Sequence, residues 1–306
     1  MTPSPPPPPA PGKGMRRRIV GVSTKMYFSA ARTEAFVQDL LGMLESPPSS
    51  ADAPGSDPRS GSETPHADFR SGSGSASGGG GNLLDLIDVF IIPDHITLAG
   101  VVRQTEMVKG RSKVIVGAQD CYSEDAGALT GEVSPAVLAE VGCGIVELGH
   151  AERRRLFGET DASTAAKAAA VARNGMLPLV CVGEVARVST LEEGIDAATK
   201  EVLGQVRCVL AALPDDADVV LAYEPVWAIG ASEPAPVEHV CGVVRRVRAS
   251  AAVQGRTGQT RIVYGGSAGP GLFARLVGGE VDGLFLGRFA HDPAQFYRTI
   301  CEVAEA

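Results

Sequence analysis

Three side chains suited to acid–base chemistry stand just after short apolar runs of the sequence. They are Lys25, His150 and Glu224, and each follows a different run. A carboxylate can act as a general base, while an imidazole and an ammonium group can stabilise negative charge that develops on a substrate oxygen. If the fold brings them to one place, these side chains form a candidate catalytic set.

Eight apolar runs alternate with longer amphipathic stretches, which is typical of repeated βα units around a parallel sheet. This periodicity does not separate a closed barrel from an open doubly wound sheet, because both bury their strands on two faces. Eight units favour the closed (β/α)8 barrel, whose active site lies at the carboxyl ends of the strands. The predicted strands are 18–23, 89–92, 114–118, 144–148, 179–182, 219–222, 262–264 and 283–286.

Two segments of biased composition are predicted to lie outside the folded core. Residues 1–14 form a proline-rich tail that we expect to be disordered. Residues 46–82, with 10 Ser, 8 Gly and 5 Pro, form a flexible insert. Subtracting these 14 and 37 residues from 306 leaves 255, close to the roughly 250 of a typical (β/α)8 barrel. We therefore expect residues 15–306 to form one barrel that is interrupted by the insert.

Charge and cysteine content exclude several classes of protein. A net charge of −8 without a long Lys/Arg run argues against nucleic-acid binding. The six cysteines form no CxxC pair and no His/Cys cluster, so neither disulfides nor a zinc site are predicted. No apolar run reaches the roughly 18 residues of a membrane span, and the N-terminus lacks the pattern of a secretion signal. We expect a cytoplasmic protein with reduced thiols that does not bind membranes.

Six motifs, in the same order along the chain, resemble those of the triosephosphate isomerase family. The residues from Ala222 to Gly230 (AYEPVWAIG) resemble the family's base-and-lid signature, and those from Glu147 to Arg154 (ELGHAERR) resemble the loop that carries its catalytic histidine. The resemblance begins at Arg18 and continues to the end of the chain, apart from the insert. It implies an α/β protein with a single (β/α)8 TIM barrel. The other motifs are STKM at 23–26, GALTGE at 127–132, CVGE at 181–184 and YGGS at 264–267.

The resemblance also implies a role for each candidate residue. Glu224 is the general base, His150 the electrophile and Lys25 the electrostatic stabiliser, with Glu152 as a partner of the lysine. A glutamate base, a neutral imidazole and a closing loop are well-known features of that family. The resemblance therefore implies isomerisation of a small sugar phosphate through an enediolate, with no need for a metal or a cofactor.

The phosphate end of the substrate is expected at the loops after the last strands. Backbone N–H groups at Gly230, Ser267 and the Gly287 turn should hold the phosphate, and residues 225–236 should form a lid that excludes water from the enediolate. In this family the third loop inserts into a second subunit, so the resemblance implies a homodimer in which Thr130 approaches the partner's lysine.

Four departures from the family pattern surround the expected ligand. Ser23 replaces the asparagine before the lysine, Ala151 replaces the serine after the histidine, and Arg288 replaces the second glycine of the last phosphate loop. The lid tail at 231–234 reads ASEP where TGKT is usual. Ser23 and Arg288, at opposite ends of the ligand, are therefore candidate substrate-binding residues that could admit a longer substrate.

Three functions remain open at this point. We rank first the interconversion of dihydroxyacetone phosphate and glyceraldehyde 3-phosphate, which belongs to glycolysis and gluconeogenesis. An isomerase of a four-carbon ketose phosphate, such as an erythrulose phosphate, ranks second. A catalytically silent binding protein ranks third, because Lys25, His150 and Glu224 are all present.

Overall fold

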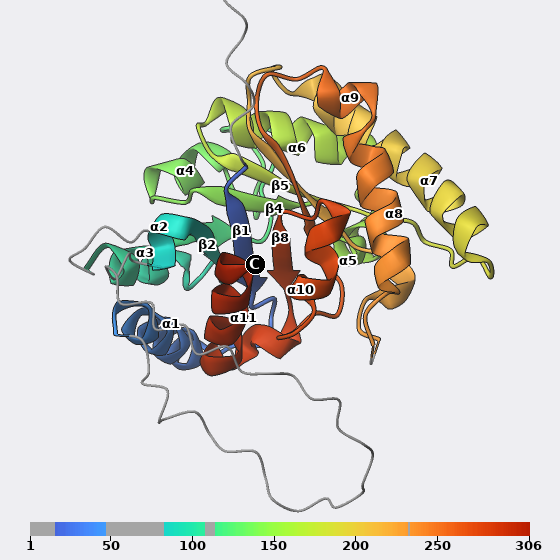
Figure 1. Cartoon of the computed structure of the whole chain (residues 1–306). Helices are drawn as coiled ribbons and strands as arrows, with labels where there is room; N and C mark the ends of the chain where they lie inside the picture. Colours follow the sequence, from blue (N-terminus) through green and yellow to red (C-terminus); the bar gives the residue numbers. More distant parts are fainter. Residues whose placement is uncertain (1–15, 47–82, 108–113, 232) are drawn as a thin grey trace, which may run out of the picture.

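Eight parallel strands close into a barrel in the order in which they occur along the chain (Figure 1). The structure, a computed structural model, describes residues 16–46, 83–107, 114–231 and 233–306. The predicted single (β/α)8 barrel is confirmed, and each predicted strand is present with its ends within two residues of the predicted ones. The strands are β1 (Arg18–Ser23), β2 (Ile87–Ile92), β3 (Ile115–Ala118), β4 (Ile145–Leu148), β5 (Leu177–Val182), β6 (Val219–Tyr223), β7 (Thr260–Tyr264) and β8 (Gly283–Leu286).

Helices surround the barrel and cover the outer faces of its strands (Figure 1). The α-helices are α1 (Ala30–Glu45), α2 (Leu83–Leu86), α3 (Leu98–Met107), α4 (Pro135–Glu140), α5 (Ala151–Phe157), α6 (Asp161–Arg173), α7 (Leu191–Ala212), α8 (Val237–Arg248), α9 (Ala251–Gln254), α10 (Phe273–Leu276) and α11 (Pro293–Glu305). Short 3₁₀ turns are η1 (Val226–Ala228), η2 (Val277–Gly279) and η3 (Arg288–His291).

Helix starts follow from local hydrogen bonding. Ser134 caps α4 by accepting a hydrogen bond from the N–H of Val137, as the Ser-Pro pair predicts. Helix α6, which begins at Asp161, is capped by the preceding residue, Thr160, which forms a reciprocal capping box with Ser163. Both helices therefore begin where side chains satisfy the first free N–H groups.

The two faces of the strands form two separate apolar layers. The outer face packs against the helices, and the inner face fills the barrel with residues that include Ile19, Phe90, Ile145 and Phe285. Gly21 is required inside the barrel, because a Cβ there would lie 2.3 Å from the ring of Phe90. The barrel is thus packed below the strand ends, and only the layer at those ends is free for chemistry.

The structure describes almost none of the two segments of biased composition. The predicted tail, 1–14, and all of the predicted insert except Ser46 lie outside the described residues. Within the described ranges, no helix is both long and apolar enough to cross a membrane. The six cysteines are all free thiols.

Candidate active site

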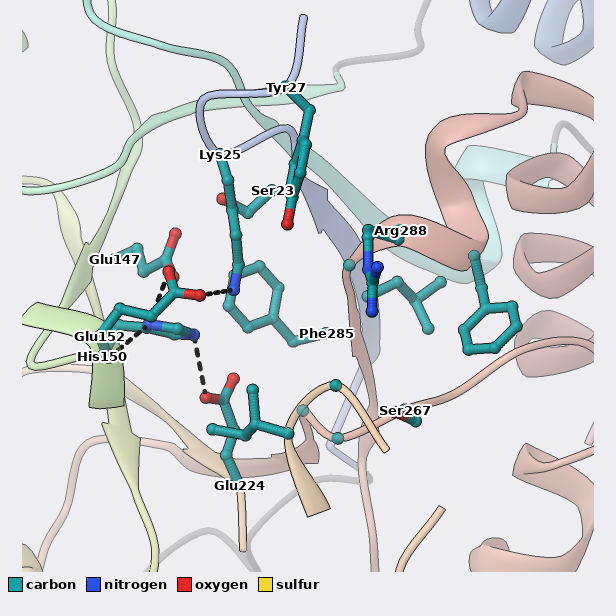
Figure 2. A pocket seen from close by; sticks show the side chains of 17 residues that line it. Ser23, Lys25, Tyr27, Glu147, His150, Glu152, Glu224, Ser267, Phe285 and Arg288 are labelled. Atoms are coloured by element: carbon teal, nitrogen blue, oxygen red, sulfur yellow. Dashed lines mark hydrogen bonds and ion pairs between the residues drawn. The ribbon is translucent and has the colours of Figure 1, made fainter. Parts of the chain in front are cut away.

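A cavity of about 120 Å³ opens at the carboxyl ends of the strands (Figure 2). It contains nearly all of the site residues that the sequence predicts. Thr130 is the exception, since it lies on the exposed loop after β3 and does not line the cavity. The predicted residues that do line it are Ser23, Lys25, His150, Glu152, Glu224, Gly230, Ser267, Gly287 and Arg288.

His150 is held in one tautomer by the helix that it begins. It is the N-cap of α5, and its Nδ1 accepts a hydrogen bond of 3.1 Å from the backbone N–H of Glu152. Nδ1 therefore carries no proton in the neutral ring, so the proton is on Nε2. That nitrogen points toward Glu224, 3.5 Å from Oε2 (Figure 2). Burial, and then the charge of Lys25, lower the pKa of His150 to about 4. The imidazole is thus a neutral hydrogen-bond donor.

We expect His150 to remain neutral until the pH falls to about 4. The unfolded chain, with a histidine pKa of about 6.5, binds the extra proton first. His150 therefore lowers the free energy of unfolding as the pH falls from about 6.5 toward about 4. ¹⁵N NMR should show a neutral, Nε2-protonated imidazole at neutral pH. The signal is assigned to His150 because it is missing from the spectrum of His150→Gln. Titration at the ordinary histidine pKa would contradict this assignment.

Lys25 has a strained backbone and a fixed ammonium group. Its φ of 46° lies in the left-handed region, where a non-glycine residue is uncommon. The side chain of Gln119 holds this conformation by donating a 2.9 Å hydrogen bond to the carbonyl of Lys25. The Nζ atom forms a 2.9 Å ion pair with Glu152. Burial lowers the pKa of the Lys25 ammonium group. The carboxylates around it, chiefly Glu152, raise that pKa by more, so the net shift is upward and the group stays charged.

Glu224 directs a desolvated carboxyl group toward the imidazole of His150. Its exposure is only 4%, and burial raises its pKa well above the ordinary value, with a smaller contribution from Glu147. Room for the carboxylate is provided by Gly265, where a Cβ would lie 2.4 Å from Oε1 of Glu224. Water is therefore largely excluded around this carboxyl group, which makes it more basic than an exposed glutamate.

The opposite side of the cavity presents backbone and positive charge. Gly230, Ser267 and Gly287 line it, and Arg288 extends into it (Figure 2). The guanidinium of Arg288 forms no hydrogen bond or ion pair with any residue in the described ranges. It lies beside the lid, since a Cβ on Gly230 would be 3.9 Å from its Nη2 atom. A free guanidinium with nearby N–H groups suits a phosphate.

The segment predicted to form a lid, 225–236, is held by hydrogen bonds near both of its ends. The indole N–H of Trp227 donates a 2.8 Å hydrogen bond to Glu184. Near the other end, the hydroxyl of Ser267 donates to the carbonyl of Ala231 at 2.9 Å, and the N–H of Ala235 donates to the hydroxyl of Tyr264 at 3.0 Å. Trp227 therefore ties the lid to the loop after β5, and the lid tail is tied to the loop and strand of the seventh unit.

Eight of the 17 residues that line the cavity were not among the predicted site residues. The three that matter most for its polarity and shape are Glu147, Tyr27 and Phe285. A glutamate inside the apolar strand IVEL is a signal that could have identified the first of them, because strands of a parallel barrel are buried on both faces. The other two carry no such signal, since an aromatic residue in or near a strand is ordinary. Among the described residues no group of three or more His, Cys, Asp and Glu side chains is arranged to hold a metal ion.

Comparison with known proteins agrees with this geometry. The chain is 42% identical over 282 residues to an L-erythrulose-1-phosphate isomerase of Pectobacterium atrosepticum, which covers 92% of this chain and 93% of the relative. An L-erythrulose-1-phosphate isomerase of Rhizobium etli is 40% identical, over 71% of this chain and 80% of its own length. A triosephosphate isomerase of Leifsonia xyli is 39% identical, over 69% and 80%.

The family model gives the broader assignment. The model described as triosephosphate isomerase matches residues 78–304, a range that includes every strand except β1 and the whole cavity except its first-strand side. The relatives are isomerases of sugar phosphates, and the barrel has the expected closed order of strands. This protein is therefore a sugar-phosphate isomerase that belongs to the triosephosphate isomerase family.

Proposed function

We propose that this protein isomerises a four-carbon ketose phosphate, with L-erythrulose 1-phosphate as the first candidate substrate. The observation that carries the proposal is the match, over nearly the full length of both chains, to an L-erythrulose-1-phosphate isomerase. Ser23 and Arg288 both line the cavity, and these two departures from the family pattern support a longer ligand. The comparisons thus favour the function that the sequence ranks second over triosephosphate isomerisation, which we keep as the alternative because relatives of that name also match.

In the proposed mechanism, Glu224 removes a proton from the carbon next to the carbonyl and returns it to the former carbonyl carbon. Negative charge develops on the carbonyl oxygen during the first transfer. The Nε2–H of His150 donates a hydrogen bond to that oxygen, and the ammonium of Lys25 stabilises the resulting enediolate. Glu152 orients the lysine through their 2.9 Å ion pair.

With L-erythrulose 1-phosphate this mechanism yields another ketose. The carbonyl is at C2, and the neighbouring carbon away from the phosphate, C3, carries one hydrogen, a hydroxyl and the C4 hydroxymethyl group. Removing the C3 proton gives a 2,3-enediolate. Transfer of the C3 hydroxyl proton to the oxygen on C2, and protonation of C2 itself, then leave a carbonyl at C3 and a hydroxyl at C2. The product is therefore an erythrulose phosphate numbered from its other end, as the 4-phosphate. A triose substrate would give an aldehyde instead, and the assignment to glycolysis and gluconeogenesis applies only to that alternative.

The phosphate is proposed to lie at Gly230, Ser267, Gly287 and the guanidinium of Arg288. The lid over residues 225–236 would then cover the enediolate. Excluding water in this way strengthens the interactions of His150 and Lys25 with the reacting oxygen, and it protects an intermediate that could otherwise expel its phosphate.

A comparison of two substrates tests the proposal. We expect kcat/KM of the purified full-length protein to be higher for L-erythrulose 1-phosphate than for dihydroxyacetone phosphate by at least about tenfold, as one added carbon group can discriminate. Solvent deuterium should appear on the substrate carbons during turnover. A preference for dihydroxyacetone phosphate would favour the triose alternative, and the absence of turnover and exchange with both would indicate a binding protein.

We further propose that the protein acts as a cytoplasmic homodimer. Exposed apolar side chains on the connections that follow β1, β2 and β4 support an interface near the site, namely Met26 (95% exposed), Ile96 (93%) and, at the end of α5, Phe157 (66%). In such a dimer the loop that bears Thr130 would reach the partner's site. Light scattering at assay concentration should give twice the chain mass, and a fully active monomer would contradict the dimer.

A further inference from the structure

A second buried carboxyl group lies in the cavity and makes no contact with the substrate in the mechanism above. It belongs to Glu147, the third residue of β4. Side chains two residues apart on a strand point to the same face, and Ile145 is part of the cluster that fills the barrel. Glu147 therefore points inward, one layer above Ile145, where it lines the cavity with only 4% exposure.

This carboxyl group is suited to bind a neutral hydroxyl. Burial raises the pKa of Glu147 to about 7, against the opposing effect of the Lys25 ammonium. Near neutral pH the group therefore exists partly as a carboxylic acid, which donates one hydrogen bond and accepts others, and partly as a carboxylate, which only accepts. Lys25 already has a 2.9 Å ion-pair partner in Glu152, so Glu147 is not required to neutralise it.

Ser23 provides a second polar group at the same place. It is 2% exposed, lines the cavity and lies within hydrogen-bonding reach of the Glu147 carboxyl group, an interaction that lowers the pKa of that residue. The pair does not reach ordinary hydrogen-bond geometry, however, so the hydroxyl of Ser23 has no such partner among the described residues. A buried polar atom without a partner is unfavourable. A ligand hydroxyl that reached this point would satisfy it.

The position of these two groups along the cavity identifies the part of the substrate that they would meet. Figure 2 shows Glu147 with His150 and Glu152 on one side, and Arg288 and Ser267 on the other. The proposed phosphate site is on the second side, and the reacting carbons must lie between His150 and Glu224. The chain of a four-carbon substrate continues beyond the reacting carbons, away from the phosphate. A three-carbon substrate carries only a hydroxyl on its last reacting carbon and has no further carbon in that direction.

We infer that Glu147, together with Ser23, binds the C4 hydroxymethyl group of a four-carbon ketose phosphate and so determines substrate specificity. This inference rests on the proposed function and assigns it to particular side chains. When Glu147 is a carboxylate, the C4 hydroxyl donates a hydrogen bond to it and accepts one from the hydroxyl of Ser23. When Glu147 is a carboxylic acid, both directions can be reversed. Dihydroxyacetone phosphate cannot make these contacts because it has no C4.

The test compares two variants of Glu147 with two substrates. Glu147→Leu should lower kcat/KM for L-erythrulose 1-phosphate by about 10- to 100-fold, the effect of one hydrogen bond to an ionisable group. For dihydroxyacetone phosphate the change should be less than about threefold, because that substrate does not reach the group. Glu147→Gln keeps a donor and an acceptor and should recover most of the four-carbon activity. Circular dichroism and thermal unfolding check that each variant is folded.

Two controls separate recognition of C4 from other effects. The inhibition constant of 2-phosphoglycolate, which carries a phosphate and a carboxylate but no C4 group, should be unchanged in Glu147→Leu. Thr260 is also a buried strand residue whose hydroxyl lacks a partner, but it begins β7 at the opposite end of the barrel. Thr260→Val should therefore leave the ratio of the two kcat/KM values unchanged.

Each possible failure has its own signature. A wild-type protein that prefers dihydroxyacetone phosphate contradicts the proposed function. An unchanged ratio of the two kcat/KM values in Glu147→Leu contradicts the present inference, whichever substrate the wild type prefers. If Glu147→Leu lowers both values equally and weakens 2-phosphoglycolate binding, Glu147 acts through the charges of Lys25 and Glu224 and does not select the substrate.

Discussion

Glu224→Gln is expected to lower kcat by between about 10²- and 10⁴-fold, the usual contribution of a general base, without unfolding the protein. The amide has nearly the shape of the carboxyl group but cannot take a proton from carbon. Exchange of the substrate's carbon-bound proton with solvent should fall by the same factor, because both processes require the same proton transfer. Steady-state assays and deuterium incorporation measure the two effects.

The same variant is expected to be at least as stable as the wild type. Burial raises the pKa of Glu224, so the folded protein retains its proton more strongly than the unfolded chain does. A raised folded-state pKa means that stability is lost as the pH rises from the unfolded value of about 4.3 through the folded one. Glutamine has no charge to desolvate, so the melting temperature of Glu224→Gln should exceed that of the wild type most clearly at mildly alkaline pH.

Glu305→Gln provides a matched control, because Glu305 is an exposed glutamate at the end of α11. It should change neither activity nor stability. Near-normal isomerisation by Glu224→Gln would show that another group is the base. A large fall in its melting temperature would instead show that the carboxyl group supports the fold.

The sequence predicts the barrel well because the strands are buried on both faces and so appear as short apolar runs. Three strands, β2, β5 and β7, begin two residues before their predicted starts. The fifth strand, for example, starts at Leu177, ahead of the predicted residue 179. Pro178 lies between the two, and a proline cannot donate to the ladder. It is accommodated as the second residue of the strand, paired with Val146.

The candidate site could be predicted in its reacting centre but not in its selectivity. Lys25, His150 and Glu224 stand in recognisable motifs, and the closed barrel brings them together. Glu147 is within one of those motifs as well, but its importance depends on facing inward and on having Ser23 beside it. These facts concern residues of β4 and β1, which are separated by more than 100 positions. No local pattern records such a contact.

Lys25→Gly is expected to separate activity from stability. Removing the ammonium group takes away a charge that stabilises the enediolate, so kcat/KM should fall by about 10²- to 10³-fold, as for other groups that stabilise an oxyanion. The chain nevertheless adopts the same turn more easily, because the φ of 46° at Lys25 costs a non-glycine residue about 1–2 kcal/mol and costs glycine almost nothing.

Two losses offset this gain, so the free energy of unfolding of Lys25→Gly stays nearly unchanged. Glycine is more flexible in the unfolded chain, which costs about 0.5–1 kcal/mol. The ion pair with Glu152 is also lost, but the side chains of Lys25 and Glu152 are 25% and 44% exposed, and a partly solvated pair contributes at most about 1 kcal/mol. The sum is close to zero, so the melting temperature should change by no more than about 4 °C, the shift that 1 kcal/mol produces in a domain of this size.

Lys25→Met isolates the strain, since it removes the charge and keeps a side chain in the left-handed conformation. It should lose as much activity as Lys25→Gly. It should also unfold at a lower temperature than Lys25→Gly, because no relief of strain compensates for the lost ion pair. Equal melting temperatures for the two variants would mean that the hydrogen bond from Gln119 does not hold a strained conformation. If Lys25→Gly kept more than about a tenth of the wild-type kcat/KM, a loss far below the usual one for such a group, the ammonium would not be the group that stabilises the enediolate.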